Sequence, residues 1–124
     1  MSIMGLINQL SRLAAGVVPT LDAAKQKRAA LARKIAALER AGIVNATPFW
    51  NKGKYLYLSY PMHRGVRRRE YIGADQDQIA GVLAKIERFK QHRALSSELE
   101  ALDAAFQGSF RALRSFYLAL ESFK

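Results

Sequence analysis

The chain has 124 residues, of which half are apolar, and this length suits a single domain (1–124) with one modest core. The absence of cysteine excludes a disulfide framework and a thiolate metal site, and it favours a reducing, cytoplasmic location. The net charge is +10, and residues 23–69 hold 12 lysines and arginines against one acid, Glu39. This local excess predicts a polyanionic partner, with a merely solvated basic surface as the alternative.

The N-terminal third of the chain has apolar residues at helical spacing. The pattern predicts one helix over 3–16, which ends before Pro19 because proline cannot continue it. It predicts a second helix over 21–41, with Thr20 as its N-cap and Gly42 just after its last residue. No apolar run is long enough for a membrane span, so we expect no membrane partner.

Residues 43–53 have the composition of a connector. Pro48 and Gly53 are unfavourable inside regular elements, and the asparagines of this stretch favour turns. Trp50 is expected to be a core residue beneath the following element.

Residues 54–73 predict a β-hairpin with a turn at Pro61–Gly65, because an aromatic run precedes the turn and an arginine run follows it. Side chains alternate across a strand, so pairing of odd with odd positions would gather aromatic and basic residues on one face. That face would hold Tyr55, Tyr57, Arg67, Arg69 and Tyr71. Such a ribbon suits either the major groove or the stacking of unpaired bases, whereas protection of a sheet edge is the structural alternative.

The remainder predicts two helices, 76–94 and 98–122. Asp75 is a plausible N-cap of the first, and Ser97 with Glu100 resembles a capping box for the second. One long bent helix is the competing interpretation. The expected fold is therefore mainly α with one β-hairpin (α+β), a helical bundle or antiparallel helical stalk with the hairpin at one end.

The run "YLYLSY", a short turn, "RRREYIG" and a helix containing "IERFKQHRAL" resembles a loosely defined group of small proteins from transposons, plasmids and other mobile elements. These proteins have a Tyr-rich hairpin followed by a long helix, and the likeness covers about residues 54–102. Members often carry a Cys-rich segment before the hairpin, whereas this chain has "NATPFWNKG" there. The resemblance therefore implies a mobile-element setting, without a mechanism or a metal.

The candidate binding residues are basic or aromatic, because guanidinium and ammonium groups bind phosphate and tyrosine rings stack on bases. They lie in the predicted hairpin, the connector and the second helix: Lys25, Arg28, Lys52, Lys54, Tyr55, Tyr57, Arg64, Arg67, Arg68, Arg69 and Tyr71.

The C-terminal helix carries more aromatic surface than one short partner helix can cover. Phe106, Phe110 and Tyr117 are therefore expected to contact another protein or a second copy of the chain.

No pattern in the chain predicts catalysis, a cofactor or a metal. His63 and His92 have no nucleophile or paired carboxylate beside them, and no phosphate-binding loop is present. The sequence predicts a non-enzymatic, mobile-element-encoded accessory protein that binds DNA or RNA. The alternative is an inhibitor, of the anti-CRISPR type, that binds a protein subunit of a host nucleoprotein defence complex.

Overall fold

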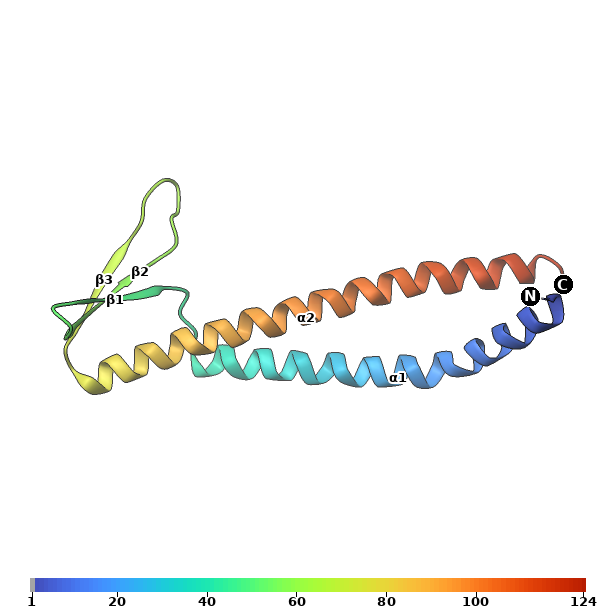
Figure 1. The fold of residues 1–124 in the computed structure, drawn as a ribbon, viewed down its shortest axis with the longest axis horizontal. Coiled ribbons are helices and arrows are strands. Elements are labelled where there is room, and N and C mark those ends of the chain that lie inside the picture. Colours follow the sequence, from blue (N-terminus) through green and yellow to red (C-terminus); the bar gives the residue numbers. More distant parts are fainter. Residues whose placement is uncertain (1) are drawn as a thin grey trace. The chain divides into compact units, whose positions relative to one another are not determined.

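The computed structural model describes residues 2–124 and has two long helices and three strands (Figure 1). The elements in order are α1 (Ile3–Ala41), β1 (Thr47–Asn51), β2 (Tyr55–Ser59), β3 (Arg69–Gly73) and α2 (Gln76–Glu121). The predicted class, mainly α with antiparallel strands, is confirmed. The chain forms two compact units, each described by itself below. The sheet unit is Lys34–Ser97, and the helical unit is the chain up to Arg33 together with Glu98–Lys124.

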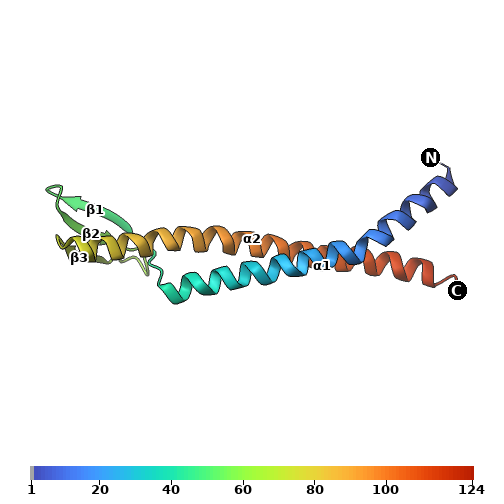
Figure 2. The same cartoon turned by 90° about the horizontal axis from the view of Figure 1, so that it is seen from below.

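Helix α1 corrects the predicted break between 3–16 and 21–41. It is one helix of 39 residues with Pro19 inside it, so Thr20 is not an N-cap. A proline removes one backbone hydrogen bond and kinks a helix, at a cost of about 3 kcal/mol, but long flanking helical segments can absorb that cost. Figure 2 shows α1 bending in its blue, N-terminal part. The predicted end is confirmed, since Gly42 follows the last residue with a φ of 101°.

Helix α2 corrects the predicted break near residues 94–97. It is one helix of 46 residues, so the competing interpretation of a single long helix is right. Ser97 and Glu100 are tolerated inside a helix, and a capping box forms only where the backbone before it is non-helical. The predicted start is confirmed, because Asp75 Oδ1 accepts a hydrogen bond from the Asp77 N–H at 2.9 Å.

The three strands form an antiparallel sheet in the order β1-β2-β3, which corrects the two-stranded prediction. The supposed connector contains β1, where Pro48 is tolerated because an edge strand has a free side. Lys52 and Gly53, with φ of 56° and 69°, then reverse the chain, and the Lys54 N–H donates to the Asn51 carbonyl at 3.3 Å. Two consecutive positive φ values are those of a type I′ hairpin turn.

The second hairpin confirms the predicted parity of its register. Tyr57 lies opposite Tyr71 and Ser59 opposite Arg69, while an irregularity between Leu56 and Tyr57 shifts the register at the end of the pairing. However, β3 begins only at Arg69, so Arg67 and Arg68 lie in the connecting loop and not in a strand. The loop is closed by His63 and Val66, whose backbones exchange hydrogen bonds of 2.8 and 3.0 Å around Arg64 and Gly65.

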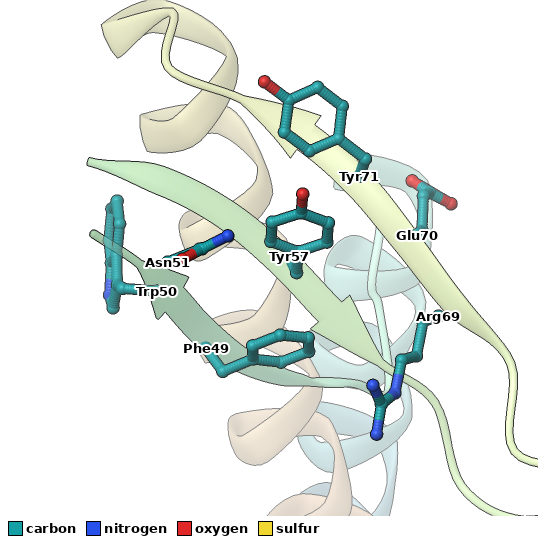
Figure 3. Close-up of a pocket in the computed structure, with 7 residues that line it drawn as sticks. All are labelled: Phe49, Trp50, Asn51, Tyr57, Arg69, Glu70 and Tyr71. Atoms are coloured by element: carbon teal, nitrogen blue, oxygen red, sulfur yellow. The ribbon is translucent and has the colours of Figure 1, made fainter. Parts of the chain in front are cut away.

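The core of the sheet unit lies between the sheet and the helices. Leu56 and Leu58 of β2 are completely buried, and Ile79 and Ile86 of α2 are nearly so. In Figure 3 the helices pass behind the sheet, on the face opposite the rings of Phe49, Tyr57 and Tyr71. Alternation along β2 therefore gives the sheet one buried, aliphatic face and one outer face.

Hydrogen bonds to main-chain carbonyls join the end of α1 to α2 in the sheet unit. Arg88 donates to the carbonyls of Gly42 at 2.7 Å and Ala41 at 3.1 Å, and the Val44 N–H donates to the Lys85 carbonyl at 3.1 Å. The arginine satisfies carbonyls that a helix end leaves without an intrahelical donor.

The helical unit pairs residues of α1 with residues of α2 through side chains. Lys27 lies 2.9 Å from Glu98, and Arg28 Nε lies 2.7 Å from Asp103 Oδ1. Within residues 2–124, no helix combines the length and apolarity that crossing a bilayer requires.

Candidate nucleic-acid interface

The outer face of the sheet carries a row of three aromatic rings, one from each strand (Figure 3). Phe49 stacks on Tyr57, with centroids 5.3 Å apart and an interplanar angle of 14°. Tyr57 contacts Tyr71 at 4.9 Å, with the planes tilted by 48°. The rings meet because these residues lie directly opposite one another in the strand register. We call Phe49, Tyr57 and Tyr71 the aromatic row.

The aromatic row lines a cavity of about 570 Å³ that faces away from the core. Tyr71 is 56% exposed and Phe49 is 36% exposed, whereas Tyr57, in the central strand, is half-buried. Trp50 lies at the margin of this cavity and is 48% exposed, so its predicted role in the core is wrong. Since β1 is an edge strand, its side chains are less covered than those of β2.

Arginines lie beside the aromatic row. The Arg69 guanidinium is 5.7 Å from the centroid of Phe49, a cation–π distance, and it also lines the cavity. Arg67 reaches the same side from the loop, where its Nη1 donates to Ser59 Oγ at 3.4 Å. The predicted grouping of Tyr57, Tyr71 and Arg69 is therefore present.

Lys54 and Tyr55 lie at the turn that joins β1 to β2. The Lys54 ammonium is 5.2 Å from the centroid of the Tyr55 ring, and Tyr55 is half-buried. Tyr55 pairs with Asn51, which also lines the cavity.

Arg68 takes a different position, against Tyr60. Its guanidinium is 4.4 Å from the Tyr60 ring, and its carbonyl accepts a hydrogen bond from the Tyr60 N–H at 2.9 Å. The Tyr60 hydroxyl donates to Glu70 Oε2 at 3.2 Å. Burial raises the pKa of Tyr60, Glu70 raises it further and Arg68 opposes them, so the phenol stays a neutral donor at physiological pH. Arg68 thus holds the base of the loop and does not join the aromatic row.

The two hairpin turns of the sheet unit have the same construction. In each, a basic residue with positive φ precedes a glycine: Lys52 at 56° before Gly53, and Arg64 at 51° before Gly65. Asparagine or glycine is the usual residue at the first of these positions, since other side chains are strained there. Both exposed turns therefore carry a cation at some cost in backbone energy.

The basic side chains beside the sheet differ from several in the helical unit in how they are paired. Within residues 2–124, none of the six lysines and arginines from Lys52 to Arg69 has a carboxylate within 4.0 Å. In the helical unit, by contrast, Lys25 lies 4.0 Å from Asp22, and Arg28 forms two hydrogen bonds with Asp103. The hydrogen bonds from Arg28 hold the pKa of Asp103 below its usual value. Lys25 and Arg28 belong to the helical unit and each has an acidic neighbour, whereas the other candidate binding residues belong to the sheet unit.

The remaining candidates lie elsewhere in the chain. Phe110 is 67% exposed and Tyr117 is 54% exposed on α2 of the helical unit, and Phe106 is half-buried there. His63 is in the tip of the loop, and His92 Nε2 lies 2.9 Å from Glu39 Oε1. Within the part of the chain that the structure describes, no cluster of three or more potential metal ligands occurs.

Phe49 is the member of the aromatic row that sequence reasoning missed. The alternation in "TPFWN", followed by a basic residue and glycine, is the signal that could have identified the first hairpin. Comparison of the chain with protein-family models, curated proteins and solved structures found no match.

Proposed function

We propose that this protein binds single-stranded nucleic acid on the outer face of its sheet. The observation that supports this function is the aromatic row, which is partly exposed and flanked by Arg69. Base stacking on aromatic side chains is worth about 1–3 kcal/mol per base and tolerates any sequence, because every base has a π-face. Phe49 and Tyr57 already cover part of one another, so Tyr71, which is 56% exposed, presents the most ring surface to a base.

The cations of the sheet unit supply the second part of the binding energy. Arg67 and Arg69 lie beside the aromatic row, Lys54 lies over the Tyr55 ring at the turn, and none of the three has a competing carboxylate within 4.0 Å among the described residues. Phosphates can therefore contact these side chains without first breaking an ion pair. Such contacts release counterions, so affinity should fall as salt rises.

An unpaired strand fits this surface better than a duplex. In a duplex the faces of the bases are already stacked on one another, so the rings would have no face to contact. Insertion into a major groove requires a slender element, such as a helix or a two-stranded ribbon. Here the row lies on a three-stranded sheet with helices behind it (Figure 3), which favours the stacking use over the groove use.

A binding measurement by fluorescence anisotropy tests this proposal. The probes are single-stranded DNA and RNA of about eight nucleotides, within the usual footprint of one stacking surface, and a duplex of matching length. We expect tighter binding to the single strands, with affinity for all probes falling between about 50 and 200 mM salt. Tyr71→Leu should weaken single-strand binding about tenfold, because it removes a stacking ring but keeps apolar volume.

The control variant is Phe123→Leu, which removes an aromatic ring that is 87% exposed in the helical unit. It should bind as the unchanged protein does. Equal affinity for duplex and single strand, together with normal binding by Tyr71→Leu, would rule out a stacking surface. Failure to bind any probe at low salt would overturn the proposed function altogether.

The mobile-element setting and the inhibitor function remain predictions from the sequence. An inhibitor of this kind would use the same cationic and aromatic side chains of the sheet unit to contact a protein subunit that binds RNA. A protein partner that stays bound after nuclease treatment would favour the inhibitor.

A further inference from the structure

The helical unit contains an apolar groove between α1 and α2. Its volume is about 1040 Å³, and its walls include Leu13, Val17 and Leu21 of α1 and Phe106, Phe110 and Leu113 of α2. Figure 2 shows the blue end of α1 and the red end of α2 pointing apart, beyond the bend in α1. The groove walls also include Val18 and Thr20, the residues on either side of Pro19, so the groove lies where the proline interrupts the hydrogen bonding of α1.

The two helix ends are apolar outside this groove as well. Ile3 and Met4 of α1 are 68% and 60% exposed, and Leu118 and Leu120 of α2 are 46% and 57% exposed, and none of them lines the groove. Leu31 is the one buried apolar side chain that the helical unit has among residues 2–124. Two helices with so little core are not expected to be stable by themselves, since helix stability comes mostly from packing of an apolar face.

The exposed apolar area is large enough for a stable interface. About a dozen large apolar side chains of this unit are roughly half exposed. Together they give an exposed apolar surface on the order of 1,000 Å² per copy. Monomeric proteins usually expose patches no larger than about 300–600 Å², and a standard interface buries about 800 Å² per partner. The area therefore matches one side of a protein interface.

We infer that a second copy of this chain fills the groove. The groove requires an apolar helix, and the helix ends of the chain itself are apolar on their outer sides. Two copies related by a two-fold axis would each place a helix end against the groove of the other, forming a four-helix arrangement. An unrelated partner in the groove would leave the outer sides of both helix ends exposed.

The charges of the helix ends predict how salt affects this association. No acid occurs in residues 3–20 or 104–120, and the bases there are Arg12, Arg111 and Arg114. Two copies would therefore repel one another weakly while burying apolar surface, so salt should preserve or strengthen the dimer. Nucleic-acid binding has the opposite salt dependence, so the two kinds of association can be told apart by varying salt. The inferred dimer does not depend on the proposed function.

The mass of the full-length protein in solution, measured by light scattering at low and high salt, tests the inference. We expect twice the monomer mass in both conditions. The double variant Leu13→Gln with Phe110→Gln should weaken the dimer at least about tenfold, since it removes two apolar contacts from the groove. Both side chains are about 70% exposed within one copy, so the change should not disrupt the monomer.

The matched control is Met62→Gln with Val66→Gln in the sheet unit, where the two side chains are 60% and 67% exposed. This variant should keep the dimer mass. As a second measurement, the melting temperature of the unchanged protein should rise with protein concentration, as mass action requires for a dimer. A monomer mass with a concentration-independent melting temperature would overturn the inference, as would a dimer that the Leu13 and Phe110 changes leave intact. Binding of the monomer to lipid vesicles would assign the groove to a membrane surface instead.

Discussion

The sheet unit and the helical unit are both basic, but they differ in the burial of their apolar side chains and in the ion pairing of their cations. The sheet unit has 12 bases and 5 acids (+7), and the helical unit has 8 bases and 5 acids (+3). The sheet unit buries the aliphatic residues of β2, and its six cations from Lys52 to Arg69 have no carboxylate within 4.0 Å in the part of the chain that the structure describes. The helical unit exposes its aliphatic residues, and its cations Lys27 and Arg28 form ion pairs.

This difference shows that the position of charges does not by itself identify a binding surface. Lys25 and Arg28 belong to the same basic stretch of sequence as the sheet cations, yet both have acidic neighbours in space. A cation that already has a carboxylate partner gains less from a phosphate. The sheet unit is therefore the better candidate for an anionic ligand, and the helical unit the better candidate for an apolar one.

The largest expected effect concerns the core of the sheet unit. Leu58→Ala should lower the free energy of unfolding by about 2–5 kcal/mol, because Leu58 is fully buried and its removal leaves a cavity. Val66→Ala, at a position 67% exposed in the same unit, is the control and should change stability little. Denaturant titration followed by circular dichroism measures both. Equal stability of the two variants would mean that the sheet is not packed as described.

A smaller effect is expected from the arginines of the outer face. Arg67→Ala with Arg69→Ala should weaken single-strand binding at least about tenfold, or 1.4 kcal/mol, because charge-assisted contacts are individually worth about 1.5–3 kcal/mol. Stability should hardly change, since exposed cations contribute little to folding.

The control for that pair removes the same charge from the same unit. Lys34→Ala with Lys85→Ala changes two exposed helical residues, neither with a carboxylate within 4.0 Å among residues 2–124, to a good helix former. Anisotropy titrations should show a clear loss for the arginine pair and only a slight loss for the lysine pair. Equal losses would mean that net charge, and not the aromatic face, determines affinity.

The smallest expected effect concerns the two hairpin turns. Lys52→Asn with Arg64→Asn should raise the free energy of unfolding by about 0.5–1 kcal/mol, because asparagine accepts a positive φ more readily. The same change should lower the salt dependence of binding by about one counterion for each cation that contacts a phosphate. Lys52→Gln with Arg64→Gln, which removes the charges without improving the turns, is the control. Unchanged salt dependence would show that the turns do not contact the ligand.

The sequence predicted the helical content and the parity of the second hairpin, because both follow from local periodicity. It did not predict β1, since a proline and a turn without Asn-Gly obscured five residues of strand. The prediction also divided each long helix in two, because Pro19 in α1 and the Ser97–Glu100 pair in α2 are local signals of a helix end. In both helices the flanking segments override that signal.

The candidate site was predicted only in part for a different reason. Tyr57, Tyr71 and Arg69 follow from alternation within one hairpin, whereas Phe49 required the third strand. The pairing of Arg28 with Asp103 joins residues 75 positions apart, and it depends on how α1 and α2 align. No local pattern contains that alignment, so the sequence could not distinguish paired cations from free ones.

The contacts of Arg88 and Val44 have a consequence for how this chain can change over time. The Val44 N–H donates to the Lys85 carbonyl and the Arg88 guanidinium donates to the carbonyls of Ala41 and Gly42, so Arg88 contributes the one side chain among these groups and the others are main-chain atoms. A main-chain atom is present whatever the side chain, so these anchors do not constrain the outer face of the sheet. Substitutions in the aromatic row or the two turns can therefore accumulate without disturbing the junction, and the ligand preference of the sheet can diverge while its supporting helices stay the same.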